Sequence, residues 1–239
     1  MNRSRTRAVW LFALTIALAL SPLVAPSVRG YDPRDFAYSI ADPPVQPAGY
    51  AFSIWLVLFA GLIWHGWRGM TARAAAPDWD RIRPAMIVAV LMAALWLNVA
   101  ALLPLLATAM ILGMAGCAVA ALLRTAPTAE PALRWPVAAF AGWSTAAAGV
   151  AVGVVAGGMG LVSAFLAALT ILLALLIIGI AVALRARSAL YAGVLAWALF
   201  GIFVGNLGSA PAVRWGALAG AGIMIAVALI AARRARRLA

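Results

Sequence analysis

Eight long apolar runs, separated by short segments that carry the charged residues, dominate the pattern of this chain. The runs occupy residues 8–25, 50–67, 86–103, 105–123, 135–156, 161–184, 189–205 and 216–232. A helix needs about 20 apolar residues to cross the roughly 30 Å hydrocarbon core of a bilayer, and the shortest runs just suffice. The pattern therefore predicts an all-α polytopic membrane protein with eight transmembrane helices.

Proline and glycine set the breaks between neighbouring runs. Pro104 alone separates the third run from the fourth, and a proline disfavours the helical conformation in the residue before it, here Leu103. A tight helical hairpin is therefore expected at this point. Gly157, Gly158 and Gly160 mark the break between the fifth and sixth runs in the same way.

Composition agrees with this layout and excludes other classes of protein. Of the residues, 67% are hydrophobic and 10% are charged, whereas soluble domains carry about 25% charged residues. The formal charge of +12 comes from arginines that punctuate apolar runs, and this placement disfavours nucleic-acid binding. A single cysteine, Cys117, and a single histidine, His65, exclude an internal disulfide and a Cys/His metal cage.

The distribution of the 18 arginines predicts the orientation in the membrane. With the N-terminus in the cytoplasm, the outer segments hold only Arg29, Arg34 and Arg214, and the other 15 fall in inner segments. Positive residues gather on the cytoplasmic side of membrane proteins, so both chain ends are expected there. The alternative for residues 3–25 is a signal peptide that is cleaved near Ala25.

Two connecting segments and the histidine have simple interpretations. The outer loop 26–49 combines aromatic, charged and proline residues, which fits either a structured cap or a solvated connector. The inner segment 68–83 resembles an ordinary charged connector. His65 lies beside Trp64 and Trp67 in the sequence, and we interpret it as a residue of the membrane interface.

Ionisable groups avoid the predicted spans. All six acidic residues fall in loops, and no arginine lies in the middle of a span. Ion-coupled pumps usually carry such a group within the membrane, so a proton-coupled transporter is disfavoured. A serine or cysteine nucleophile would depend on His65, which lies at the wrong depth. The sequence therefore predicts a protein that is not an enzyme.

Aromatic residues form the most specific candidate site. Phe52, Trp55 and Phe59 are spaced so that they share one face of the second predicted helix, and Tyr50 lies at its outer mouth. Beneath a proline-rich loop, this face predicts a pocket for a flat apolar ligand such as a porphyrin or a sterol. The same periodicity also fits a simple core stripe, and spacing alone does not separate the two.

Small and polar residues within the runs predict helix contacts. Glycines repeat every four residues over 149–157, and again at Gly201 and Gly205. This spacing lets helices approach closely in lipid. We expect the partner helices to lie in the same chain, with a homodimer as the alternative. Asn98 and Asn206 are expected to hydrogen-bond to neighbouring helices, and Asn98 facing a cavity is the alternative.

Two motifs resemble the TspO/MBR family of translocator and tryptophan-rich sensory proteins. Pro47-Ala-Gly-Tyr-Ala-Phe-Ser-Ile-Trp-Leu-Val-Leu-Phe59 is similar to the opening of that family's second helix. Phe140-Ala-Gly-Trp-Ser-Thr-Ala-Ala147 is similar to an aromatic and tryptophan motif in its fifth helix. The order of a helix, a long outer loop and four more helices also fits. The last three runs resemble a longer bacterial branch of the family.

This resemblance implies a five-helix TspO-like bundle over residues 1–156, with the outer loop 26–49, and a three-helix extension over 157–239. It implies a multi-pass protein of the bacterial inner membrane whose partners are the bilayer and a hydrophobic small molecule. The implied role is that of a tryptophan-rich sensory receptor for a planar ligand, with porphyrin or haem as a ligand. By position, the residues implied to line the pocket are Tyr31, Tyr38, Tyr50, Phe52, Trp55 and Trp143.

Phe59, from the helical spacing, and Asn98, from its place in the third run, complete the candidate ligand-binding residues. Two alternatives to a receptor stay open at this point. One is a permease for a small apolar or zwitterionic solute. The other is a scaffold whose glycine-rich faces recruit partner membrane proteins without binding a small ligand.

Overall fold

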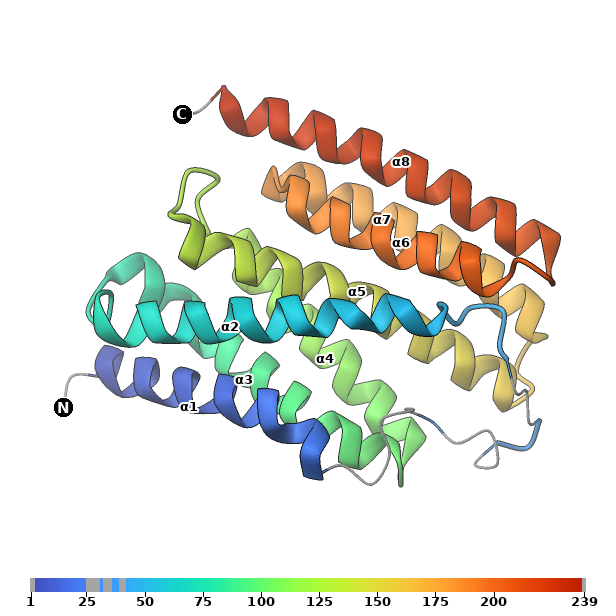
Figure 1. Ribbon diagram of the computed structural model, residues 1–239, viewed down its shortest axis with the longest axis horizontal. Helices are drawn as coiled ribbons and strands as arrows, with labels where there is room; N and C mark the ends of the chain where they lie inside the picture. The colour runs from blue at the N-terminus through green and yellow to red at the C-terminus, as the bar shows by residue number, and fades with distance from the viewer. Residues whose placement is uncertain (1–2, 25–30, 32–35, 39–41, 238–239) are drawn as a thin grey trace.

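The computed structural model describes residues 3–24, 31, 36–38 and 42–237, and this part of the chain forms eight α-helices (Figure 1). The α-helices are α1 (Arg3–Val24), α2 (Ile54–Thr71), α3 (Pro77–Ala100), α4 (Pro104–Leu123), α5 (Pro131–Gly158), α6 (Ala164–Ala186), α7 (Ala189–Gly205) and α8 (Pro211–Arg236). A short 3₁₀ helix, η2 (Gly49–Ser53), leads directly into α2. The all-α prediction is confirmed.

Local sequence explains where most helices begin. Pro77, Pro104, Pro131 and Pro211 each lie in the first turn of a helix, where the missing N–H costs no helical hydrogen bond. The break predicted at 103–104 is confirmed, because α3 ends at Ala100 and α4 begins at Pro104. The helices α6 and α7 instead begin after serines whose hydroxyl oxygens accept backbone N–H groups, as N-caps do.

Seven of the eight helices are long and apolar enough to cross a membrane. The helix α7 is apolar but has 17 residues, which corresponds to about 25 Å of helix. It packs between longer helices, against α5, α6 and α8. The chain is therefore a multi-pass membrane protein, and each of the eight predicted runs corresponds to a helix.

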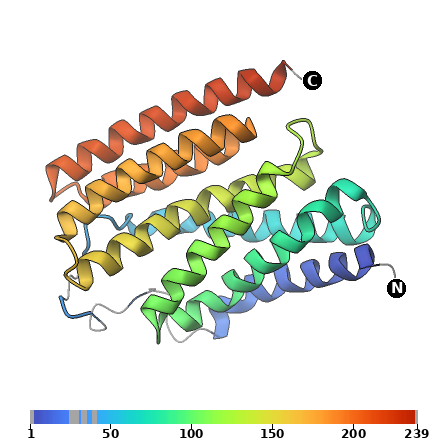
Figure 2. The same cartoon turned by 180° about the vertical axis from the view of Figure 1, so that it is seen from behind.

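The central element of the bundle is α5. Of its most apolar window, 72% is buried, against 28–44% in the other candidate spans, because α2, α4, α6 and α7 all pack against it. Figures 1 and 2 show α8 and α1 at opposite edges of the bundle, with α5 between them. Because α5 is surrounded in this way, it forms a wall of any cavity between these helices.

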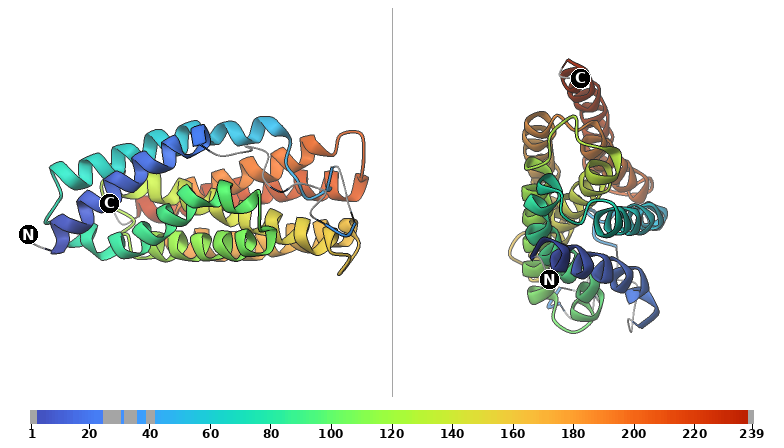
Figure 3. Two further views of the ribbon diagram at one scale, coloured as in Figure 1. Left: turned by 90° about the horizontal axis from the view of Figure 1, so that it is seen from below. Right: turned by 90° about the vertical axis from the view of Figure 1, so that its left-hand side faces the viewer.

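The helices alternate in direction, so the connections fall at two ends. The connections 72–76, 124–130 and 187–188 lie at one end of the bundle. We call it the basic end, because several arginines lie in or beside these connections. Both described chain ends also lie at the basic end (Figure 3). We call the opposite end, which carries segment 42–53, the cavity end.

Segment 68–83 was predicted to be an ordinary charged connector, but much of it is helical and several of its side chains are buried, so that prediction is wrong. The helix α3 already begins at Pro77, and the Trp79 and Arg83 side chains are each 1% exposed. The Arg83 guanidinium donates hydrogen bonds to the carbonyls of Gly69 (2.9 Å) and Arg73 (2.8 Å). These acceptors belong to the C-terminal end of α2 and the turn after it, so one buried cation fixes the α2–α3 connection.

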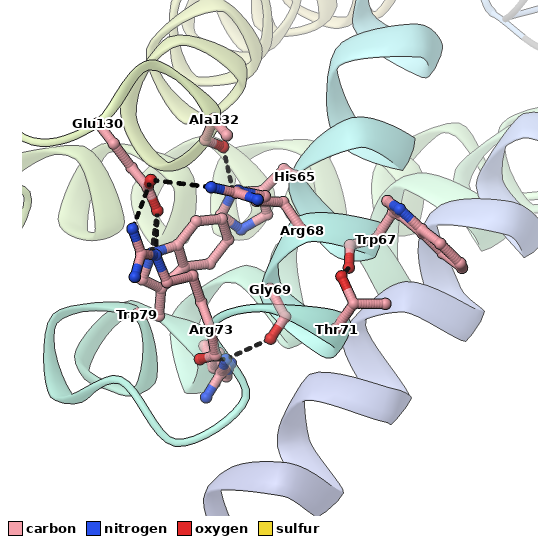
Figure 4. Close-up of polar contacts among 10 residues, drawn as sticks. His65, Trp67, Arg68, Gly69, Thr71, Arg73, Trp79, Glu130 and Ala132 are labelled. Carbon is pink, nitrogen blue, oxygen red and sulfur yellow. Dashed lines mark hydrogen bonds and ion pairs between the residues drawn. The ribbon is translucent and has the colours of Figure 1, made fainter.

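His65 faces the interior, so its predicted place at the membrane interface is also wrong. Its side chain is 0% exposed, and its ring stacks on that of Trp79 with centroids 4.7 Å apart (Figure 4). Its Nδ1–H donates to the carbonyl of Ala132 at 2.9 Å. Trp64 and Trp67 do point outward, because successive residues of a helix are rotated by about 100° from one another.

The glycine repeat over 149–157 contacts a helix of this chain, as predicted, whereas Gly201 and Gly205 lie against segment 46–51. A Cβ at Gly149 would lie 2.9 Å from a methyl carbon of Leu175, and one at Gly157 would lie 3.1 Å from the backbone of Ala164. Both partners belong to α6. The predicted domain boundary at 156/157 falls in the last turn of α5.

Candidate ligand-binding cavity

A cavity of ≈830 Å³ lies at the cavity end of the bundle. Its walls come mainly from α1 to α5 and η2, Ala164 of α6 and Ala198 of α7 also line it, and segment 42–49 lies across it. It is not fully enclosed, because the lining residues Phe52 of η2 and Leu56 of α2 are 43% and 72% exposed. The volume falls within the roughly 300–1,000 Å³ that is typical of small-molecule sites.

Four aromatic rings, from η2, α2 and α5, form one wall of the cavity. The Trp143 ring meets Phe52 and Trp55 edge-on, with centroids 5.7 Å and 6.4 Å apart. The ring of Phe59 lies 5.3 Å from that of Trp55. Edge-on contacts of this kind are favourable beyond simple burial, so the rings hold one another in place without a ligand.

A second aromatic group lines the cavity from the loop and α3. The Tyr31 ring packs edge-on against Phe36 and Trp96, and its hydroxyl shares a hydrogen bond of 2.7 Å with the Thr108 hydroxyl. Burial raises the pKa of the Tyr31 phenol, so the group stays neutral and protonated. The Trp96 indole N–H donates to the carbonyl of Ala107 at 3.0 Å. The Tyr31 hydroxyl and the Trp96 indole N–H therefore form hydrogen bonds that stabilise this wall of the cavity.

The roof of the cavity is segment 42–49, and α7 holds it in place. The Ala48 N–H donates to the carbonyl of Gly201 at 2.9 Å, and the Asn206 amide donates to the carbonyl of Pro44 at 2.8 Å. Sequence reasoning missed this role of α7, although Gly201 and Gly205 carried its signal. Asn206 was expected to hydrogen-bond to a neighbouring helix, but its amide instead donates to the roof.

The same helix also contacts the residues just after the roof. The Trp197 indole N–H donates to the carbonyl of Ala51 at 2.9 Å, which ties α7 to the 3₁₀ turn that precedes α2. The Tyr50 ring packs edge-on against the Trp197 ring, with centroids 5.4 Å apart. The turn η2, which carries Phe52 into the cavity, is therefore positioned by α7.

The structure brings six of the eight candidate residues together around this cavity: Tyr31, Tyr38, Phe52, Trp55, Phe59 and Trp143. Tyr50 points away from it toward α7, with its side chain 40% exposed. Asn98 is partly buried near the end of α3 and does not line the cavity. The predicted cap over residues 26–49 is described only at residue 31, 36–38 and from 42 onward. The role of these residues toward a ligand stays a prediction.

The cavity offers few charged groups to a ligand. Among its described lining residues, Asp42 carries the ionisable carboxyl, and the remaining titratable groups are the phenols of Tyr31 and Tyr38. No hydrogen bond joins the indole N–H of Trp55 or Trp143 to another residue in the described part of the chain. Among the described residues, the cavity thus combines apolar walls with two indole N–H groups that no other residue accepts.

Comparison with known proteins agrees with this arrangement. The family model described as TSPO-like protein matches residues 8–230, which run from the first helix into the last. Neither the curated proteins nor the solved structures that were compared gave a match. The three helices after residue 156 lie within the matched range, apart from the end of α8. A match over nearly the whole chain shows that this protein belongs to the family of TSPO-like proteins.

Proposed function

We propose that this protein is a membrane receptor that binds a hydrophobic, planar ligand of the porphyrin or sterol kind. The observation that carries this proposal is the ≈830 Å³ cavity, whose wall is built by the rings of Phe52, Trp55 and Trp143. Flat apolar molecules gain most from rings that are already fixed, because no side-chain freedom is lost on binding.

Polar features of the cavity favour a porphyrin among such ligands. The indole N–H groups of Trp55 and Trp143 would donate hydrogen bonds to an acceptor at the rim of the ring system, such as a carboxylate. Exposure of Phe52 and Leu56 connects the cavity to the side of the bundle, which suits a ligand that partitions into lipid. Membership of the TSPO-like family supports a sensory role for such binding.

Binding rather than catalysis fits the chemistry of the lining. A general base or nucleophile needs a titratable partner within hydrogen-bond reach. Asp42 is the single described carboxylate that lines the cavity, and His65 lies toward the basic end of α2, away from its walls. In this proposal the protein positions the ligand and carries out no reaction on it.

The proposal includes an orientation in the membrane. The basic end carries most of the described arginines, including Arg68, Arg124 and Arg185, whereas Arg214 lies toward the cavity end. By the positive-inside tendency, the basic end and both chain termini lie in the cytoplasm of a bacterial cell, at its inner membrane. The cavity then opens near the outer face.

A porphyrin titration tests the proposal. The purified protein is titrated with protoporphyrin IX, and binding is followed through the absorbance of the porphyrin, which does not depend on protein tryptophans. We expect Trp55→Ala and Trp143→Ala to weaken binding about tenfold, since each removes roughly 1.4 kcal/mol of ring contact. Trp135→Ala is the matched control, because Trp135 is exposed and lies outside the cavity lining. Equal affinity in all four proteins would contradict the proposal.

Transport would give a different result in a second assay. Saturable uptake of a small apolar or zwitterionic solute into proteoliposomes, unaffected by Trp55→Ala, would favour a permease over a receptor. Crosslinking to partner membrane proteins that is unchanged by porphyrin would favour a scaffold. Analytical ultracentrifugation in detergent reports whether the protein forms a homodimer.

A further inference from the structure

Four arginines gather where α6 and α8 finish, at the basic end of the bundle. Arg185 lies in the last turn of α6 and Arg187 directly follows that helix. Arg234 lies in the last turn of α8 and Arg237 follows it. These four side chains, together with Leu184, line an open hollow of ≈560 Å³. The hollow is distinct from the aromatic cavity and lies at the opposite end of the molecule.

The positive charge of this hollow is not balanced by the described carboxylates. Asp80 is bound by Arg7 at 3.0 Å, and Glu130 is bound by Arg73 at 2.9 Å, in a cluster around α1, α3 and the start of α5. Asp42 lies at the cavity end. Among residues 3–24, 31, 36–38 and 42–237, no ion pair involves an arginine of the hollow. Like charges held together in this way repel one another, and an anion between them would relieve the repulsion.

The backbone beneath the hollow is fixed. Arg187 adopts a left-handed conformation with φ of 51°, at a helix C-terminus where glycine is usual. The buried guanidinium of Arg134 donates hydrogen bonds to the carbonyls of Ala186 and Arg187, and Ser188 N–H donates to the carbonyl of Ala183. These hydrogen bonds fix the backbone of Arg187 beside Arg185, so the Arg187 side chain starts from an ordered turn.

The hollow also lies at the boundary of the apolar region. Leu184 forms part of its lining, and the exposed side chains of Ile177 and Ile178 continue along α6 toward the middle of the bundle. Ile230 is exposed one turn before Arg234 on α8. An anionic group in the hollow would therefore have apolar surface directly beneath it.

We propose that this hollow binds the phosphate headgroup of an anionic phospholipid, whose acyl chains lie along the exposed apolar surface of α6 and α8. Guanidinium groups bind phosphate oxygens through paired hydrogen bonds, and four of them match a headgroup that carries more than one phosphate. Basic pockets between membrane helices bind headgroups of this kind. Free phosphate shares the headgroup chemistry but lacks the acyl chains. This inference does not depend on the aromatic cavity.

Native mass spectrometry of the full chain, extracted in mild detergent and mixed with cardiolipin and phosphatidylcholine, tests the proposal. We expect the wild type to retain cardiolipin in preference to phosphatidylcholine. Arg187→Gln with Arg234→Gln should reduce retention about tenfold. Arg233→Gln with Arg236→Gln is the matched control. It also removes two positive charges, both from the end of α8, but neither residue lines the hollow. Equal loss in both double variants, or no loss in either, would overturn the proposal.

A second measurement separates lipid from free phosphate. The thermal unfolding temperature of the wild type is recorded with cardiolipin and, separately, with inorganic phosphate at the same phosphate concentration. We expect a larger increase with cardiolipin, and this difference should disappear in the Arg187→Gln and Arg234→Gln variant. An equal increase with inorganic phosphate would overturn the lipid assignment. If that variant does not fold, Arg185→Gln with Arg237→Gln replaces it, with the same expected losses.

Discussion

Alanine at Gly201 tests how tightly α7 fits against the roof of the cavity. A Cβ at this position would lie 2.8 Å from the Cβ of Ala51 and 3.0 Å from the Cβ of Pro47. Neither neighbour can rotate away, because a Cβ atom is fixed by the backbone. Gly193 lies on the same helix, and a Cβ there would meet nothing within 4 Å. The two glycines therefore form a matched pair.

The structure gives the expected size of the difference between these variants. Both substitutions gain roughly 1 kcal/mol of helix propensity, because each replaces a glycine inside a helix. Gly201→Ala also overpacks the contact with Ala51 and Pro47, which costs about 1–3 kcal/mol. The propensity gain cancels in the comparison. The free energy of unfolding should therefore be about 1–3 kcal/mol lower for Gly201→Ala than for Gly193→Ala.

Reversible unfolding in detergent, followed by circular dichroism, measures this difference. Adding Ala51→Gly to Gly201→Ala removes the nearer of the two Cβ atoms, so we expect the double variant to regain part of the lost stability, after allowing for the effect of Ala51→Gly alone. Equal stability of Gly201→Ala and Gly193→Ala would refute the close fit of α7 on the roof. So would a double variant with no recovery.

Three further predictions concern the polar contacts. Arg134→Met should lower the free energy of unfolding by about 1.5–3 kcal/mol in the same assay, because the buried Arg134 guanidinium donates hydrogen bonds to several carbonyls. Arg124→Met, at an exposed site, should have little effect. Hydrogen bonds from Arg73 hold the pKa of Glu130 below its usual 4.5. The free energy of unfolding of the wild type should therefore fall as the pH drops from about 4.5 through the lowered pKa. Thermal melts at a series of pH values should show that Glu130→Gln loses this dependence. Trp197→Phe removes one hydrogen bond to the start of α2, so stopped-flow dissociation of protoporphyrin IX should be about two- to tenfold faster.

The elements of this fold are readable from the sequence because lipid imposes a simple rule on it. A span must be apolar along its whole length, so eight runs predict eight helices, and Pro104 shows where the third run ends and the fourth begins. The shared face of Phe52, Trp55 and Phe59 was readable for a similar reason, since helical spacing alone brings these side chains together on one side of η2 and the α2 helix that continues it.

Contacts between helices were not readable, because apolar runs say little about how each helix is rotated. His65 was misplaced for this reason, as its partners Trp79 and Ala132 come from α3 and α5. The direction of Tyr50 depends on the 3₁₀ turn over Gly49–Ser53, where residues are rotated by about 120° each. Phe52 lies in the same turn but follows Tyr50 by two residues, so its side chain is rotated by about 240° from that of Tyr50 and lines the cavity.

The most direct measurement of the central claim is a crystal structure of the protein grown with protoporphyrin IX. The account predicts the macrocycle inside the cavity, in contact with the rings of Trp55 and Trp143 and covered by segment 42–49. A macrocycle bound on the outer surface of the bundle, with the cavity free of ligand, would contradict it.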